Sequence, residues 1–90
     1  MNIKRRVGCV LRKRRLKLDL TLQNVAEHSG LSLGYISQVE LGKNSASLYT
    51  LLKLCEVLGM TLAKLFRGIG PKDVSDDEPV PDAVPEAAVL

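Results

Sequence analysis

The stretch Thr21–Gly42 constrains the fold more than any other part of this sequence. Its first half places Leu22, Val25 and Ala26 at i, i+3 and i+4, which is the spacing of one helical face. Gly30 then interrupts the pattern, at a point where a left-handed or otherwise special backbone is expected. The sequence therefore predicts a short helix, from about Leu22 to Ser29, that ends in a tight turn.

A second short helix is predicted directly after the turn, from about Leu33 to Leu41. Ser32 can cap its first turn, and Ile36 and Val39 face inward at i, i+3. The opposite face is small, neutral or hydrogen-bonding, which suits a surface that enters a groove; it carries Leu33, Gly34, Ser37 and Gln38. Two helices joined in this way indicate a helix-turn-helix at about 21–42, whose second helix reads the DNA major groove.

Three further helices complete an all-α prediction. The first runs from Ile3 to about Leu18, with an apolar stripe of Val7, Val10, Leu11 and Leu18. The fourth runs from Leu48 to Leu58, between a capping Ser47 and a closing Gly59, with an inward stripe of Leu48, Leu51, Leu52, Cys55 and Leu58. Thr61 caps a short fifth helix from Leu62 to about Arg67.

Charge is distributed very unevenly along the 90 residues. All four prolines and six of the ten acidic residues lie in the last 20 positions, whereas residues 1–70 hold 12 of the 13 Lys and Arg residues and only four acids. The first part therefore carries a net charge of +8 (12 minus 4), which favours a polyanionic partner such as nucleic acid over a merely solvated basic surface. We expect one domain at 1–69 and a disordered acidic tail at 70–90.

The polar face of the first predicted helix is almost purely cationic, and like charges at this spacing oppose helix formation. Phosphate groups would offset that repulsion, and the alternative is a solvated amphipathic face. We favour phosphate contact by some of these residues, which are Lys4, Arg5, Arg6, Arg12, Lys13, Arg14, Arg15 and Lys17.

Taken together, the chain from about Val7 to Arg67 resembles the lambda-repressor-like helix-turn-helix family of phage repressors, Cro proteins and bacterial regulators. The motifs that carry the resemblance are Gly8 with Leu11-Arg12 and Arg15-Leu16, LTL at 20–22, Val25-Ala26, the turn at Gly30, YISQVELGK at 35–43 and SLYTLLKLCEVLGMTLAKLF at 47–66. The resemblance implies a compact five-helix bundle.

The resemblance also implies which residues meet DNA. Positions expected to touch base edges are Ser32, Leu33, Gly34, Ser37 and Gln38, and positions that usually contact phosphate are Tyr35, Lys43 and Asn44. Arg12 and Arg15 match recurrent family cations, although Arg15 has the alternative of bridging to Glu40 inside the fold. Leu22 stands where many members have a phosphate-gripping Gln, so we expect the adjacent Gln23 to take over part of that contact.

The expected reading surface is poor in long polar side chains. Gly34 has no side chain with which to read a base, and Leu33 can contact only a thymine methyl group. Direct hydrogen-bond readout therefore rests mainly on Gln38, with Ser37 and Ser32. A Gln can make a bidentate pair with adenine, worth roughly 1–3 kcal/mol of discrimination.

These features predict a sequence-specific, double-stranded DNA-binding transcriptional regulator, specifically a repressor that binds a palindromic operator as a homodimer. Half-sites would lie about 34–36 Å apart, with Phe66 and Ile69 at the dimer interface. The alternative is an antitoxin that controls its own promoter and binds a toxin through the acidic tail, which ends in AAVL; a solubilising tail without a partner competes with that interpretation.

An enzyme is not expected. His28 is the only histidine, and its neighbours Glu27 and Ser29 point to other sides of a helix. The sequence has no metal-ligand spacing and no phosphate-binding glycine loop, so no catalytic residue, metal or cofactor is predicted. Cys9 and Cys55 lack CxxC spacing and are expected to be reduced, mostly buried thiols. We expect a cytoplasmic protein of bacterial, plasmid or phage origin, with no membrane partner.

Overall fold

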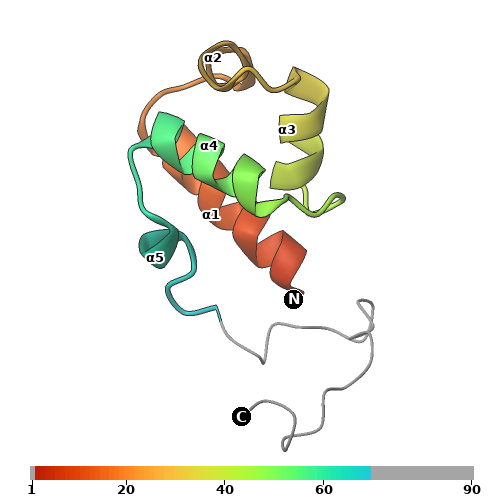
Figure 1. The fold of residues 1–90 in the computed structure, drawn as a ribbon, viewed down its shortest axis with the longest axis vertical. Helices are drawn as coiled ribbons and strands as arrows, with labels where there is room; N and C mark the ends of the chain where they lie inside the picture. The colour runs from red at the N-terminus through yellow and green to blue at the C-terminus, as the bar shows by residue number, and fades with distance from the viewer. Residues whose placement is uncertain (1, 70–90) are drawn as a thin grey trace, which may run out of the picture.

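The structure, a computed structural model, describes residues 2–69. This part of the chain forms five helices and no strand: α1 (Ile3–Lys17), α2 (Leu22–Ser29), α3 (Leu33–Glu40), α4 (Leu48–Leu58) and α5 (Leu62–Leu65). Figure 1 shows α1 crossing behind α4, with α2 and α3 packed at one end of this pair and α5 at the other side. The all-α, five-helix prediction is confirmed, whereas the predicted disordered tail at 70–90 lies outside the described residues.

Local capping explains where the helices begin. The side-chain oxygens of Asn2, Thr21, Ser32, Ser47 and Thr61 each accept a hydrogen bond from a backbone N–H in the first turn of the following helix. Such caps satisfy amide groups that have no partner inside the helix. Thr21 and Asn24 form a complete capping box, in which each side chain accepts a hydrogen bond from the backbone N–H of the other residue. The Asn24 side chain accepts from the Thr21 N–H at 2.9 Å.

A single apolar core joins the helices, and it contains Val7, Leu11, Val25, Ile36, Val39, Leu51, Leu54, Cys55, Leu58 and Leu65. Three residues expected in the core are exposed instead. On α4, Leu48 and Leu52 are 63% and 50% exposed, and Leu54 is buried in their place. Leu18 is 39% exposed because it lies past the end of α1, as its C-cap. Cys9 and Cys55 are free thiols, with Cys9 half-buried and Cys55 buried.

Gly8 allows α1 to lie directly against the end of α3. A Cβ atom at this position would fall 2.4 Å from the Val39 carbonyl oxygen and 2.5 Å from that of Glu40. These are backbone atoms that cannot move aside as a flexible side chain can, so only glycine fits. This contact fixes which side of α1 faces α3, and it thereby sets the position of the helix expected to read DNA.

Candidate nucleic-acid interface

The turn between α2 and α3 has the predicted left-handed glycine. Gly30 has φ 76° and donates its N–H to the Ala26 carbonyl at 2.9 Å. The next N–H, of Leu31, is accepted at 3.2 Å by the hydroxyl of Ser29, which is itself buried. This role of Ser29 was not predicted; its one sequence signal is a Ser immediately before the turn glycine.

The helix α3 presents two distinct faces. Ile36 and Val39 are buried in the core, as predicted. On the opposite side the structure brings together all five residues expected to contact bases: Ser32, Leu33 and Gly34 are exposed, and Ser37 and Gln38 are half-buried. They form one surface along the cap and first two turns of α3, which we call the reading surface.

Two positions of the reading surface are open to a ligand. Within residues 2–69 the side chain of Gln38 forms no hydrogen bond, so its amide group is available to a base edge. A Cβ atom on Gly34 would meet no other atom within 4 Å. Packing within the described residues therefore does not require glycine at position 34.

Exposed polar and cationic residues flank the reading surface. Lys43 and Asn44 lie in the loop after α3, and their N–H groups donate to the Gln38 carbonyl at 2.9 and 3.4 Å. Gln23 is exposed at the start of α2, where its amide donates to Glu27 at 3.4 Å, and Arg12 is exposed on α1. These four expected phosphate contacts therefore come from three segments, namely α1, α2 and the loop after α3.

Arg5 is a further cation that sequence reasoning did not single out from the charged face of α1. A Cβ atom on Gly42 would fall 2.6 Å from Arg5 Cγ, so the stem of this side chain packs against the end of the α3 segment. Arg5, Gly8, Arg12 and Arg15 are spaced by three, four and three residues and therefore share one side of α1. That side faces α3, and no sequence signal distinguished it from the rest of the cationic face.

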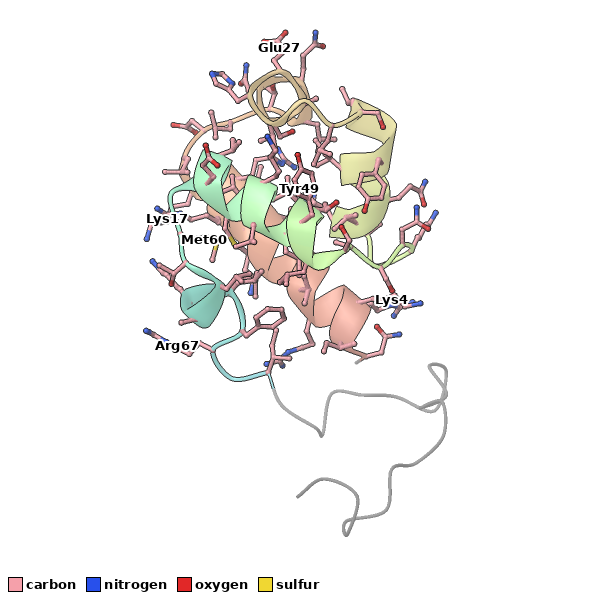
Figure 2. The ribbon with its side chains drawn as sticks, in the orientation of Figure 1. Lys4, Lys17, Glu27, Tyr49, Met60 and Arg67 are labelled. Atoms are coloured by element: carbon pink, nitrogen blue, oxygen red, sulfur yellow. The ribbon has the colours of Figure 1, made fainter. Side chains whose placement is uncertain are left out.

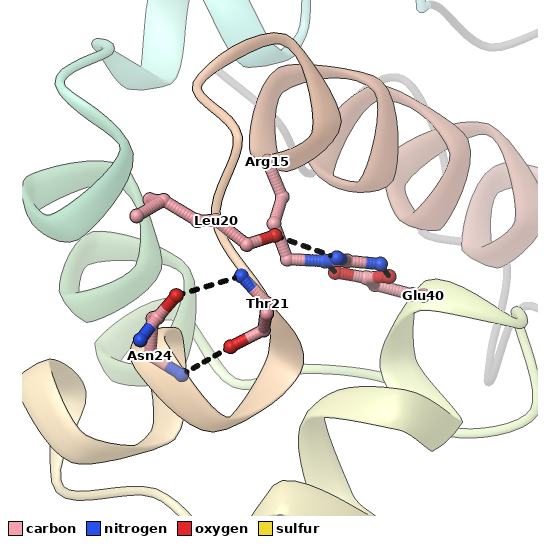
Figure 3. A network of polar contacts seen from close by, with 5 residues as sticks. All are labelled: Arg15, Leu20, Thr21, Asn24 and Glu40. Atoms are coloured by element: carbon pink, nitrogen blue, oxygen red, sulfur yellow. Dashed lines mark hydrogen bonds and ion pairs between the residues drawn. The ribbon is translucent and has the colours of Figure 1, made fainter.

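Arg15 takes its alternative role inside the protein (Figure 3). Its guanidinium donates from Nε to Glu40 Oε2 at 2.8 Å, from Nη2 to Glu40 Oε1 at 3.0 Å, and from Nη1 to the Leu20 carbonyl at 2.9 Å. The two charged side chains keep only 10% and 7% of their surface exposed. The hydrogen bonds to Glu40 raise the pKa of Arg15, against the opposing effect of burial. We therefore replace the phosphate assignment of Arg15 with this ion pair.

A hydroxyl cluster connects α3 to the beginning of α4. The Tyr35 hydroxyl donates to Thr50 Oγ1 at 3.4 Å, and the Ser47 hydroxyl donates to the same oxygen at 3.1 Å. Thr50 is buried and was not identified from the sequence. Because Tyr35 is half-buried in this cluster, only part of its side chain can face a phosphate.

The described residues offer little chemistry of other kinds. Within residues 2–69, no group of three or more His, Cys, Asp and Glu side chains is placed to hold a metal ion. His28 Nδ1 lies 2.7 Å from the Asn24 carbonyl oxygen of its own helix. None of the helices in this part of the chain is both long and apolar enough to cross a membrane.

Comparison with protein families and curated proteins gives consistent matches. The helix-turn-helix family model matches residues 11–65. The control protein C.MunI of a Mycoplasma species is 41% identical over 69 residues, which are 76% of this chain and 93% of that protein. The transcriptional regulator ClgR of Mycobacterium tuberculosis is 33% identical over 66 residues, and this chain spans 59% of its length.

Solved structures agree with this result. The clp gene regulator ClgR from Corynebacterium glutamicum superimposes with a TM-score of 0.72 at 31% identity, over 74% of this chain and 71% of that one. The restriction-modification controller protein C.AhdI from Aeromonas hydrophila superimposes with a TM-score of 0.68 at 33% identity, over 70% of this chain and 96% of that one.

The Arg15–Glu40 pair can be tested by removing one charge. Glu40→Gln preserves shape but leaves the buried guanidinium without its counter-charge, so we expect the free energy of unfolding to fall by about 3 kcal/mol. Urea denaturation measures this loss. The matched control is Glu27→Gln on the exposed side of α2, which should change stability by less than about 0.5 kcal/mol. Equal effects of the two substitutions would contradict a structural role for the pair.

Proposed function

This chain belongs to the helix-turn-helix family, and on that premise we propose that it represses transcription by binding a palindromic operator as a homodimer. Members of this family are DNA-binding regulators, and this chain is a sequence-specific DNA-binding transcriptional regulator. The observation that carries the proposal is the reading surface, an uncharged and at least partly exposed face of α3 that is followed by the exposed Lys43 in the next loop. Its composition suits contact with base edges, and Lys43 suits a flanking phosphate.

Repression follows from simple occlusion, which needs no further chemistry. A dimer of this size would cover a short operator and exclude other proteins from the same DNA. The relatives named above are control and regulator proteins, so they favour this function over that of an antitoxin. We propose no enzymatic activity, and we expect the protein to act in the cytoplasm, where its DNA is found.

We further propose that the chain is a controller of a restriction–modification system. C.MunI and C.AhdI are covered almost end to end, at 93% and 96%, whereas the ClgR proteins are covered at 59% and 71%. Sequencing the DNA around the gene tests this assignment. Adjacent genes for a restriction endonuclease and a methyltransferase would support it, and their absence would contradict it.

The dimer surface is proposed from exposed apolar residues. Phe66 and Ile69 remain candidates, although both are half-buried against the core. The outer face of α4 adds Leu48, Tyr49 and Leu52, which are 63%, 66% and 50% exposed. Figure 2 shows Tyr49 on this outer face. Contiguous apolar surface of this kind is typical of protein–protein contacts.

Base readout and phosphate contact predict different responses to mutation. Gln38→Ala should weaken operator binding by about 1–3 kcal/mol and relax preference at one base position. Lys43→Ala should weaken binding to all DNA sequences by the same factor, and it should reduce the slope of log affinity against log salt concentration by about one. Titrations of operator and random duplexes at several salt concentrations measure both effects. An equal loss on operator and random DNA would remove Gln38 from base readout.

The dimer surface can be tested with one charge on α4. Leu52→Glu would bury a carboxylate between two apolar faces, which is unfavourable without a partner. We expect the variant to sediment as a monomer and to lose at least tenfold in operator affinity. Leu16→Glu is the matched control, since Leu16 is 52% exposed on α1. A Leu52→Glu protein that remains dimeric would exclude this face from the interface.

A further inference from the structure

A second cationic surface lies outside the proposed DNA interface. It is a groove of about 320 Å³ between α1 and the segment around α5, and its apolar lining residues are Val10 and Met60. Its other lining residues are all cations, namely Lys13, Arg14, Lys17, Lys64 and Arg67. We call this surface the α1–α5 groove. Five positive charges around one concave surface require an explanation that the reading surface does not supply.

The α1–α5 groove is on the far side of α1 from α3. Gly8 and Arg15 define the side of α1 that faces α3, through the backbone contact and the ion pair with Glu40. At 100° per residue, Lys13 and Lys17 lie roughly on the opposite side of the helix. Figure 2 shows Lys17, Met60 and Arg67 away from α3. A straight duplex held by α3 therefore lies on the other side of the molecule.

Only one of the five cations is engaged within residues 2–69. Arg14 donates from Nε to the Leu58 carbonyl at 2.8 Å and from Nη2 to the Gly59 carbonyl at 3.2 Å, at the end of α4. In the same part of the chain, Lys13, Lys17 and Lys64 form no ion pair. Like charges gathered in this way repel each other, so an anionic occupant would stabilise the arrangement.

The chain itself carries a matching anion. Residues 71–90 contain six acidic residues and one lysine, a net side-chain charge of −5, against the five cations of the groove. Four of the acids fall within six positions, at Asp73, Asp76, Asp77 and Glu78. The described chain ends at Ile69, two residues after Arg67, which lines the groove.

Chain length permits the contact. Val10 and Lys17 are separated by about 10 Å along α1, whereas twenty residues can span up to roughly 66–72 Å. A tethered segment also acts at an effective concentration in the millimolar range. Several individually weak surface ion pairs can therefore hold it together.

We propose that the acidic segment 71–90 binds in the α1–α5 groove of its own chain. The contact cancels positive charge on the side of the protein that cannot read bases. It also keeps the acidic residues away from the cations beside the reading surface. DNA is then attracted mainly to the face that carries α3.

The proposal is tested by backbone amide NMR of the full chain, without DNA, so that the result is independent of the proposed function. Neutralising the first four acids (Asp73→Asn, Asp76→Asn, Asp77→Asn and Glu78→Gln) should shift the amide signals of Lys13, Lys17 and Lys64. The shifts should disappear near 1 M salt, where the Debye length is about 3 Å. The amide of Lys53, on α4, should not move.

The reciprocal variant is Lys13→Gln with Lys17→Gln, which should shift the amides of residues 73–78. The matched control, Lys43→Gln with Lys53→Gln, also removes two positive charges, but outside the α1–α5 groove. It should leave the amide signals of residues 73–78 unchanged. Unmoved groove signals in the acid-neutralised chain would overturn the proposal. So would shifts centred on Lys43 and Asn44, which would place the acidic segment on the DNA side instead.

Discussion

The ion pair between Arg15 and Glu40 is the interaction on which the position of the reading helix depends. It joins the end of α1 to the end of α3, and its third hydrogen bond reaches the Leu20 carbonyl before α2. One guanidinium therefore connects α1, the segment that leads into α2, and the end of α3. Burial of such a pair is favourable only when good geometry and hydrogen bonds offset the cost of desolvation. Here each of the three guanidinium nitrogens donates one hydrogen bond, and both Glu40 carboxylate oxygens accept one.

Features set by neighbours in sequence were predictable. Helix starts follow from capping residues such as Thr21, Ser32 and Ser47, which act within three positions, and the turn follows from Gly30. Features that depend on contacts between residues far apart in the sequence were not predictable. On leucine-rich α4 the apolar positions cover more than one face, so only packing against other helices decides that Leu54 is buried and Leu52 is not. Burial of Arg15 likewise depends on a partner 25 residues away.

The candidate DNA interface likewise has one part that the sequence predicts and one part that depends on distant residues. The reading surface could be located from the sequence because its residues share one face of a short helix. The side of α1 that carries Arg5 and Arg12 could not be located, because cations surround most of that helix. Its orientation depends on two contacts with distant residues, at Gly8 and in the Arg15–Glu40 ion pair. Because α3 has few long polar side chains, we expect discrimination between DNA sequences to depend on DNA shape and half-site spacing as well as on Gln38, with phosphate contacts fixing the register.

Selection of bound sequences from random duplex DNA tests the central claim, sequence-specific reading by α3, most directly. The full chain should enrich a palindromic motif whose half-site centres lie about 10–10.5 base pairs apart. Gln38→Ala should enrich the same spacing with one position per half-site degenerate. Binding without an enriched motif, or an enriched motif that Gln38→Ala leaves fully intact, would contradict this account.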